Sequence, residues 1–176
     1  MSKSNWAIDH SHSGVNFTVR HMMFAKVKGQ FNAFDAVIEA DPQDLTTASI
    51  SFSIDTASVD TNNGDRDAHL RSADFFEVEN HPKITFTATK IEKVGENEYK
   101  VTGDTTLRGV TRSETFDVEF GGSGKDPWGN EKVGFSVEGT INRSDYGLVW
   151  NAALETGGVL VGDEIKISVD IQAAKA

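Results

Sequence analysis

The chain of 176 residues contains no cysteine, which excludes disulfide bonds, thiolate metal ligands and a cysteine nucleophile. It also lacks any apolar run approaching the roughly 18 residues that a membrane-spanning helix requires. The N-terminal residues show no apolar block of the length that a secretory signal needs, and Asp9 lies among them. We therefore expect a cytoplasmic protein without integral membrane association.

Positive charge is scarce as well, because 17 Lys and Arg residues face 27 Asp and Glu residues and the formal net charge is −10. A chain this acidic is repelled by phosphate backbones and by anionic membrane surfaces. Nucleic acid is therefore not an expected partner. The length suits a single domain over residues 1–176, and a fold of this size buries roughly 70% of the surface that its unfolded chain exposes.

What the sequence does contain is a repeated alternation of apolar and polar residues. In the clearest run, Ala48, Ile50, Phe52 and Ile54 alternate with serines and an aspartate. A period of two is typical of β-strands with one buried face. Similar runs recur almost to the C-terminus and indicate about eight core strands. The pattern predicts an all-β protein whose sheet either packs on another sheet or closes on itself.

Three segments depart from this alternation. The parity of the apolar residues changes near Ala33, which predicts a bulge or corner in a long strand. Residues 121–130 are rich in glycine and are predicted to form a long loop. Residues 63–72 are polar, with aspartates early and Arg71 late, as the helix dipole favours, and they predict a short helix.

Motifs for catalysis or metal binding are weak throughout the chain. There is no Gly-x-Ser-x-Gly sequence for a nucleophilic serine and no phosphate-binding loop motif. His10 and His12 are two residues apart, and we interpret them as ordinary surface residues because two histidines do not define a metal site. Asp65 and His69 are interpreted as helix-capping and surface charges. We predict no catalytic residue, no metal ligand and no cofactor.

The apolar faces combine small residues with phenylalanines, and this mixture has two interpretations. Large side chains can pack beside small ones in a filled barrel or sandwich, or the small residues can leave a tunnel for a guest. In a tunnel, each buried methylene of a lipid tail contributes about 0.8 kcal/mol. The residues expected to contact such a tail are Phe17, Val19, Phe31, Ile50, Phe52, Phe86, Leu107, Phe135, Val137 and Ile167.

Four blocks of sequence, in order, resemble the YceI family, the lipocalin-like polyisoprenoid-binding proteins of bacteria. The blocks are residues 12–23 with 29–31, residues 64–76 with 82–86, residues 103–111, and residues 141–148 with 162–164. The resemblance implies an extended eight-stranded antiparallel barrel with a short helical insertion near residues 63–72. It also implies an apolar tunnel for an isoprenoid or similar long-chain amphiphile, and some members of the family form homodimers.

The function that we predict is non-catalytic binding, with carriage or storage, of a long-chain isoprenoid or comparable lipid. One hypothesis places His21, Arg143 and Asp145 at the tunnel mouth, in contact with a phosphate or quinone head group. In the alternative, Arg143 and Asp145 pair to hold a turn. Two other functions stay open: an enzyme that acts on such a lipid with His12 or His21 as base, and a stress-related interaction module with a filled barrel.

Overall fold

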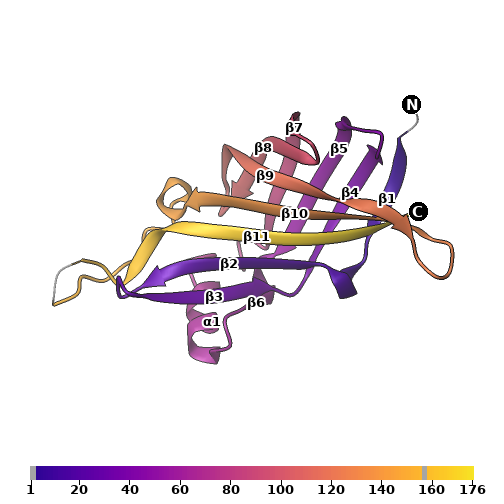
Figure 1. The fold of residues 1–176 in the computed structure, drawn as a ribbon. Coiled ribbons are helices and arrows are strands. Elements are labelled where there is room, and N and C mark those ends of the chain that lie inside the picture. Colours follow the sequence, from indigo (N-terminus) through magenta and orange to yellow (C-terminus); the bar gives the residue numbers. More distant parts are fainter. Residues whose placement is uncertain (1–2, 156–157) are drawn as a thin grey trace.

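The structure is a computed structural model that describes residues 3–155 and 158–176 (Figure 1). Its strands are β1 (Ser4–Ile8), β2 (Gly14–His21), β3 (Ala25–Phe31), β4 (Phe34–Asp41), β5 (Asp44–Asp55), β6 (Val59–Asp60), β7 (Lys83–Gly95), β8 (Glu98–Leu107), β9 (Val110–Lys125), β10 (Glu131–Asn142) and β11 (Val161–Lys175). The helical segments are α1 (Gly64–Arg71) and the 3₁₀ turns η1 (His10–His12), η2 (Thr56–Ser58) and η3 (Arg143–Tyr146).

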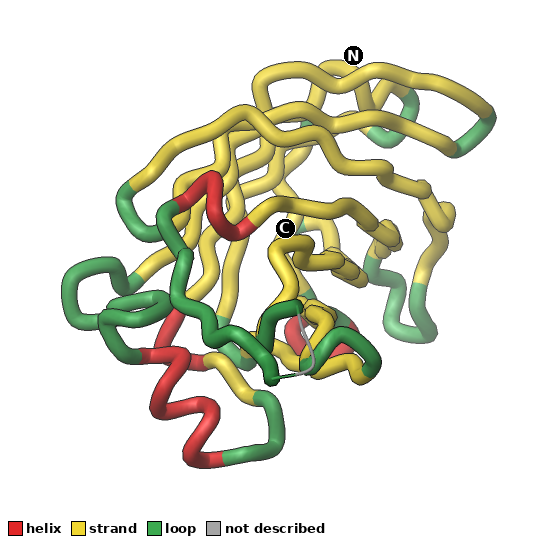
Figure 2. Tube along the Cα trace, turned by 90° about the vertical axis from the view of Figure 1, so that its left-hand side faces the viewer, coloured by secondary structure: helices red, strands yellow, loops and turns green. Residues whose placement is uncertain are grey.

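These strands build a closed antiparallel barrel with eight strands. β1 and β2 are two parts of one bent strand, because both pair with β11, and β3 and β4 are two parts of the next, since β2 pairs with β3 and β1 with β4. The two-residue β6 only extends the edge of β3. Figure 2 shows the strands curving around the interior. The all-β barrel is therefore confirmed, and the break between β3 and β4 confirms the corner near Ala33.

One end of the barrel, which we call the closed end, carries both termini and the β4–β5, β7–β8 and β9–β10 turns (Figure 1). Here β1 completes the ring, because Trp6 pairs with Ile38 of β4 on one side and with Lys175 of β11 on the other. The Trp6 ring is buried, and its Nε1 donates a hydrogen bond of 3.1 Å to the carbonyl of Ala40. Backbone ladders thus close this end.

The opposite end, which we call the loop end, carries the β2–β3 turn, the insertion over residues 56–82, the β8–β9 turn and residues 143–155 and 158–160. At this end β3 pairs with the short β6 instead of β5. The insertion contains α1, where the Asn63 side chain accepts a hydrogen bond from the backbone N–H of Arg66. Buried Asp67 accepts bonds from the backbone N–H and the hydroxyl of Thr61. The helix predicted for residues 63–72 is confirmed.

The long loop predicted for residues 121–130 is wrong over its first half. β9 continues to Lys125, with Gly122 opposite Gly134 and Gly124 opposite Lys132 of β10. Glycines carry no side chain, so an apolar–polar alternation cannot show there, whereas a ladder needs only backbone groups. Only residues 126–130 form the turn, which is held by Asp126 as acceptor for the backbone N–H groups of Trp128 and Asn130.

Candidate functional site

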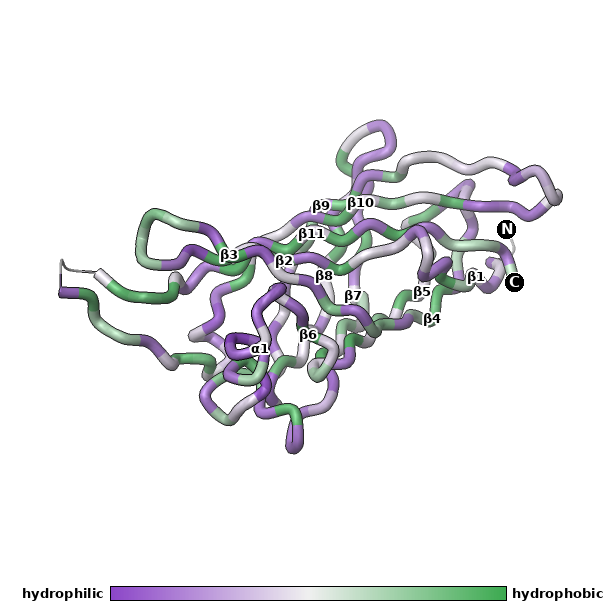
Figure 3. The backbone as a smooth tube through the Cα atoms, turned by 90° about the horizontal axis from the view of Figure 1, so that it is seen from below, coloured by the Kyte–Doolittle hydropathy of each residue, from purple (hydrophilic) through white to green (hydrophobic). Residues whose placement is uncertain are grey.

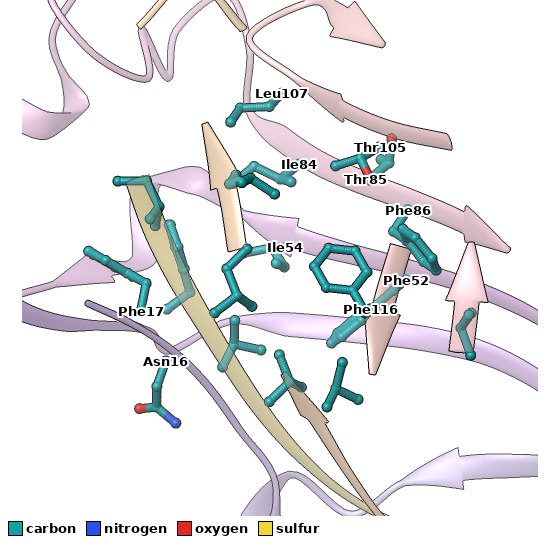
Figure 4. Close-up of a pocket in the computed structure, with 18 of the residues that line it drawn as sticks. Asn16, Phe17, Phe52, Ile54, Ile84, Thr85, Phe86, Thr105, Leu107 and Phe116 are labelled. Atoms are coloured by element: carbon teal, nitrogen blue, oxygen red, sulfur yellow. The ribbon is translucent and has the colours of Figure 1, made fainter. Parts of the chain in front are cut away.

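A cavity of about 300 Å³ lies inside the barrel (Figure 4). Its wall comes from β2–β5 and β7–β11, from α1 and η3, and from residues that follow these two helical segments. Nearly all of the wall residues are apolar, and the polar ones are Asn16, Thr85, Thr105 and Arg143. The volume is in the range of small-molecule sites, which starts at about 300 Å³. An interior of this kind accepts hydrocarbon, because burying apolar surface is its main source of binding free energy.

All ten residues expected to contact a lipid tail lie on the wall of this cavity. Their placement follows from the period of two, since every second residue of a strand faces the same side of the sheet. Figure 4 shows Phe17, Phe52, Phe86 and Leu107 projecting toward the same space from different strands. Their contact with a ligand stays a prediction.

Several wall residues were not expected from the sequence. Leu70 of α1 and the following Phe75 and Phe76 cover the cavity at the loop end. The Phe76 ring meets the Phe31 ring of β3 edge to face, with the centroids 5.6 Å apart. Two consecutive phenylalanines after a polar helix indicate a segment that packs on the interior. The period of two does not identify them, because they do not lie in a strand.

The space beside some of the glycines in the strands is filled by phenylalanine rings. A Cβ atom added to Gly139 would lie 2.3 Å from the Phe116 ring, which shows that the ring rests directly on the glycine. The pairs with this arrangement are Gly29–Phe17, Gly103–Phe86 and Gly139–Phe116. Large-beside-small packing and a cavity therefore coexist, because these rings lie against the wall and leave space elsewhere in the interior.

Thr105 is a polar exception on the apolar wall. Its side chain is buried, and its Oγ1 is the one buried side-chain oxygen without a hydrogen-bond partner among the described residues. The neighbouring hydroxyl of fully buried Tyr146 donates instead to a carboxylate oxygen of Glu114. Burial, followed by the bond to Glu114, raises the pKa of Tyr146. The cavity wall thus includes one buried hydroxyl, that of Thr105, close to Tyr146.

Arg143 is on the cavity wall, but most of its donors serve the protein itself. Its side chain is 4% exposed, and burial lowers the pKa of the guanidinium, whereas Asp163 at 3.9 Å raises it. The guanidinium donates to four carbonyls, those of Leu148 (2.7 Å), Gly162 (2.8 Å), Trp150 (3.0 Å) and Val161 (3.2 Å). Arg143 therefore holds the two ends of the segment between η3 and β11 together.

The expected pair of Arg143 and Asp145 is wrong, because the carboxylate near Arg143 belongs to Asp163. Asp145 is exposed, and its backbone carbonyl accepts a bond of 2.9 Å from Nε of Arg112. His21 stands at the end of β2, opposite Ala25. Neither Asp145 nor His21 is among the residues of the cavity wall. Of the three expected head-group residues, the structure brings only Arg143 to the cavity.

The histidines proposed as bases are also not among the residues of the cavity wall. His12 is in η1, where its ring is 64% exposed and its Nδ1 lies 2.8 Å from the Asp9 carboxylate. His10 lies in the same turn, not in a strand.

Over residues 3–155 and 158–176, no group of three or more His, Cys, Asp or Glu is arranged to hold a metal ion. Likewise, no helix in that part of the chain is long and apolar enough to cross a membrane.

Comparisons with known proteins agree with this geometry. The family model of the YceI-like domain matches residues 6–173. A UPF0312 protein of Staphylococcus epidermidis is 45% identical over 173 residues, which are 98% of this chain and 97% of that protein. The crystal structure of a Campylobacter jejuni YceI protein is 35% identical, covers 89% of this chain and 90% of its own, and has a TM-score of 0.77.

A third neighbour shows the same fold at low sequence identity. It is a polyisoprenoid binding domain from Saccharophagus degradans implicated in plant cell wall breakdown, with 15% identity and a TM-score of 0.72. The alignment covers 98% of this chain and 99% of that one. At 15% identity, this likeness shows a shared fold.

Proposed function

The chain belongs to the family of YceI-like domains, and on that basis we propose that it binds a long-chain isoprenoid or similar amphiphilic lipid inside its barrel. The lipid is carried or stored without being chemically changed. The polyisoprenoid binding by the Saccharophagus degradans domain supports this ligand class. The cytoplasmic location and the homodimer stay predictions.

The observation that carries the proposal is the apolar wall of the cavity. Most strands contribute to it, so an extended hydrocarbon would contact the barrel along its length. At about 0.8 kcal/mol per buried methylene, a tail needs few polar contacts to bind.

The same cavity is an argument against the interaction module with a filled barrel. The rings of His12 and His21 lie off the wall, which is an argument against a lipid-modifying enzyme that uses either as base.

The direct test is organic extraction of the protein purified from its natural host, followed by mass spectrometry. We expect one isoprenoid or long-chain lipid in a near-stoichiometric amount. Protein that yields no lipid, and that does not take up an added fluorescent fatty acid or prenol, would contradict the proposal.

A pair of variants on β5 makes this test specific to the cavity. Ala48 lies on the cavity wall, whereas its neighbour Ser49 is exposed on the outer face. Ala48→Trp should fill the interior and reduce the bound lipid at least tenfold, whereas Ser49→Trp should leave it unchanged. Equal lipid content in the two variants would show that the lipid binds elsewhere.

A further inference from the structure

The turn between β2 and β3 forms an exposed apolar surface at the loop end. Met22, Met23 and Phe24 are 38%, 55% and 78% exposed, and Val159 of the adjacent segment is 40% exposed. We call these four residues the apolar tip. The tip is a defined structure, because the Met22 N–H donates to the carbonyl of Leu160 at 2.8 Å. In Figure 3 the β2–β3 turn is green and projects from the body of the barrel.

Two other tight turns of the barrel, β7–β8 and β8–β9, contain glycine or polar residues instead. Turns with a left-handed backbone favour glycine, asparagine and aspartate. Asn97 (φ 63°) and Gly109 (φ 75°) occupy such positions in the β7–β8 and β8–β9 turns. In the β2–β3 turn, Met22 (φ 55°) and Met23 (φ 68°) take this conformation at a steric cost. Stability of the turn therefore does not explain its apolar residues.

Basic residues lie on the outer face of the strands next to the apolar tip. Arg20 and Lys26 are directly opposite each other on β2 and β3, and both are exposed. Lys28 and Lys166 stand on either side of Thr18 on the same face. We call these four cationic residues the basic flank. Like charges placed directly opposite each other in a sheet are destabilising.

Among the described residues, no carboxylate lies within ion-pair distance of the basic flank, although Glu164 is exposed on the neighbouring part of β11. The basic flank is also an exception in a chain whose net charge is −10. The anion that it fits is therefore external to the chain.

We propose that the apolar tip and the basic flank dock the loop end of the barrel on an anionic lipid bilayer. Apolar side chains enter the boundary between head groups and acyl chains, and nearby Lys and Arg residues are attracted to anionic lipids. The cavity wall extends close to the tip, since Val161 of the wall is paired with His21 next to Met22. Exchange of the cargo at this surface rests on the proposed function, whereas docking itself does not.

The test measures binding of the protein to vesicles of phosphatidylcholine with 30% phosphatidylglycerol by co-sedimentation, with pure phosphatidylcholine vesicles in parallel. We expect binding to the anionic vesicles that weakens with added salt. The double substitution Met23→Ser with Phe24→Ser should weaken it at least tenfold. The matched control is Trp128→Ser, because Trp128 is 82% exposed in the β9–β10 turn of the closed end, and this variant should bind as the parent does.

A second pair of variants tests the basic flank. Lys26→Gln should weaken binding to the anionic vesicles about fivefold, which corresponds to ~1 kcal/mol for a lysine near the membrane surface. Lys93→Gln, an exposed lysine of β7, should have no effect. Equal losses in the tip variant and the Trp128 variant, or no vesicle binding by the parent, would overturn the proposal.

A second copy of the chain is the rival occupant of the tip. A dimer in analytical ultracentrifugation that disappears in the Met23→Ser, Phe24→Ser variant would overturn membrane docking. Lipid extraction from the same variants separates the two proposals. Retained lipid with lost vesicle binding supports docking, whereas vesicle binding by protein that never contains lipid contradicts the proposed function alone.

Discussion

The two ends of the barrel are held together by different interactions. At the closed end, β1 joins β4 and β11 through backbone ladders, and the ring of strands is continuous. At the loop end, irregular segments cover the interior, and arginine side chains hold them by donating to backbone carbonyls. A ladder opens cooperatively, whereas single side-chain bonds can break one at a time, so local opening is expected where backbone pairing is sparse. If the proposed function holds, the loop end is therefore where we expect the barrel to admit its ligand.

Arg143 is one of several arginines that act in this way. Arg108 donates to the carbonyls of Gly147 (2.9 Å) and Ala73 (2.7 Å), and thereby connects the two covering segments. Arg71 of α1 donates to the carbonyl of Ala57 at 3.0 Å. Carbonyls at irregular segments have no partners in a ladder, and a guanidinium with five N–H donors can satisfy several of them at once. A few arginine side chains therefore fix the irregular segments that cover the loop end.

The largest expected effect comes from Arg143→Gln at the loop end. This change removes most donors from four carbonyls in a buried site and should lower the free energy of unfolding by about 3–5 kcal/mol. Urea denaturation measures the loss, and limited proteolysis should show new cleavage within residues 148–160. Arg112→Gln is the matched control, because Arg112 is exposed and its Nε donates to one carbonyl. A loss below that of the control would contradict the role given to Arg143.

A smaller effect is expected from Trp6→Phe at the closed end. The variant keeps an aromatic ring but loses the hydrogen bond to the Ala40 carbonyl, which is worth about 1 kcal/mol. Because the ladders of β1 remain, proteolysis should reveal no new cleavage site. New cleavage near β1 would show that the closed end depends on this side chain as strongly as the loop end depends on Arg143.

The smallest effect concerns the response of the closed end to acid. Bonds from Ser11 and His12 to the Asp9 carboxylate, with Lys132 nearby, lower the pKa of Asp9 below its ordinary value. A lowered pKa in the folded state contributes stability that is present above about pH 4 and is lost as the pH falls further. Asp9→Asn should therefore be less stable than the parent at pH 7, with a difference that shrinks toward pH 2. Urea denaturation of both proteins between pH 7 and pH 2 measures this difference in the free energy of unfolding. A difference that stays constant across this range would contradict the lowered pKa of Asp9.

Much of the fold and of the cavity wall follows from the period of two. Alternation identifies which side chains of a strand share a face, so residues such as Phe52 and Val137 could be placed on the interior without coordinates. It gives no information where side chains are absent, and the strand at residues 121–125 was missed for that reason. The helix was predictable because its cap and its charge order are local features.

Other features depend on pairings between distant segments. The partners of Arg143 are backbone carbonyls, which every residue has, and no residue type marks them in the sequence. The contact of Phe116 with Gly139 requires the register between β9 and β10, which the alternation alone leaves open. The head-group residues were inferred from charged side chains near strand ends. The structure shows that such a side chain can instead fix the backbone, because the Arg143 guanidinium donates to carbonyls of its own chain.

The phenylalanine rings that rest on glycines have a consequence for engineering. Trimming Phe116 to alanine would uncover a recess above Gly139 that is one aromatic ring deep and faces the lumen. A synthetic cargo with an aromatic substituent could fit there. Each ring-and-glycine couple is thus a separate point at which the shape of the accepted guest can be redesigned.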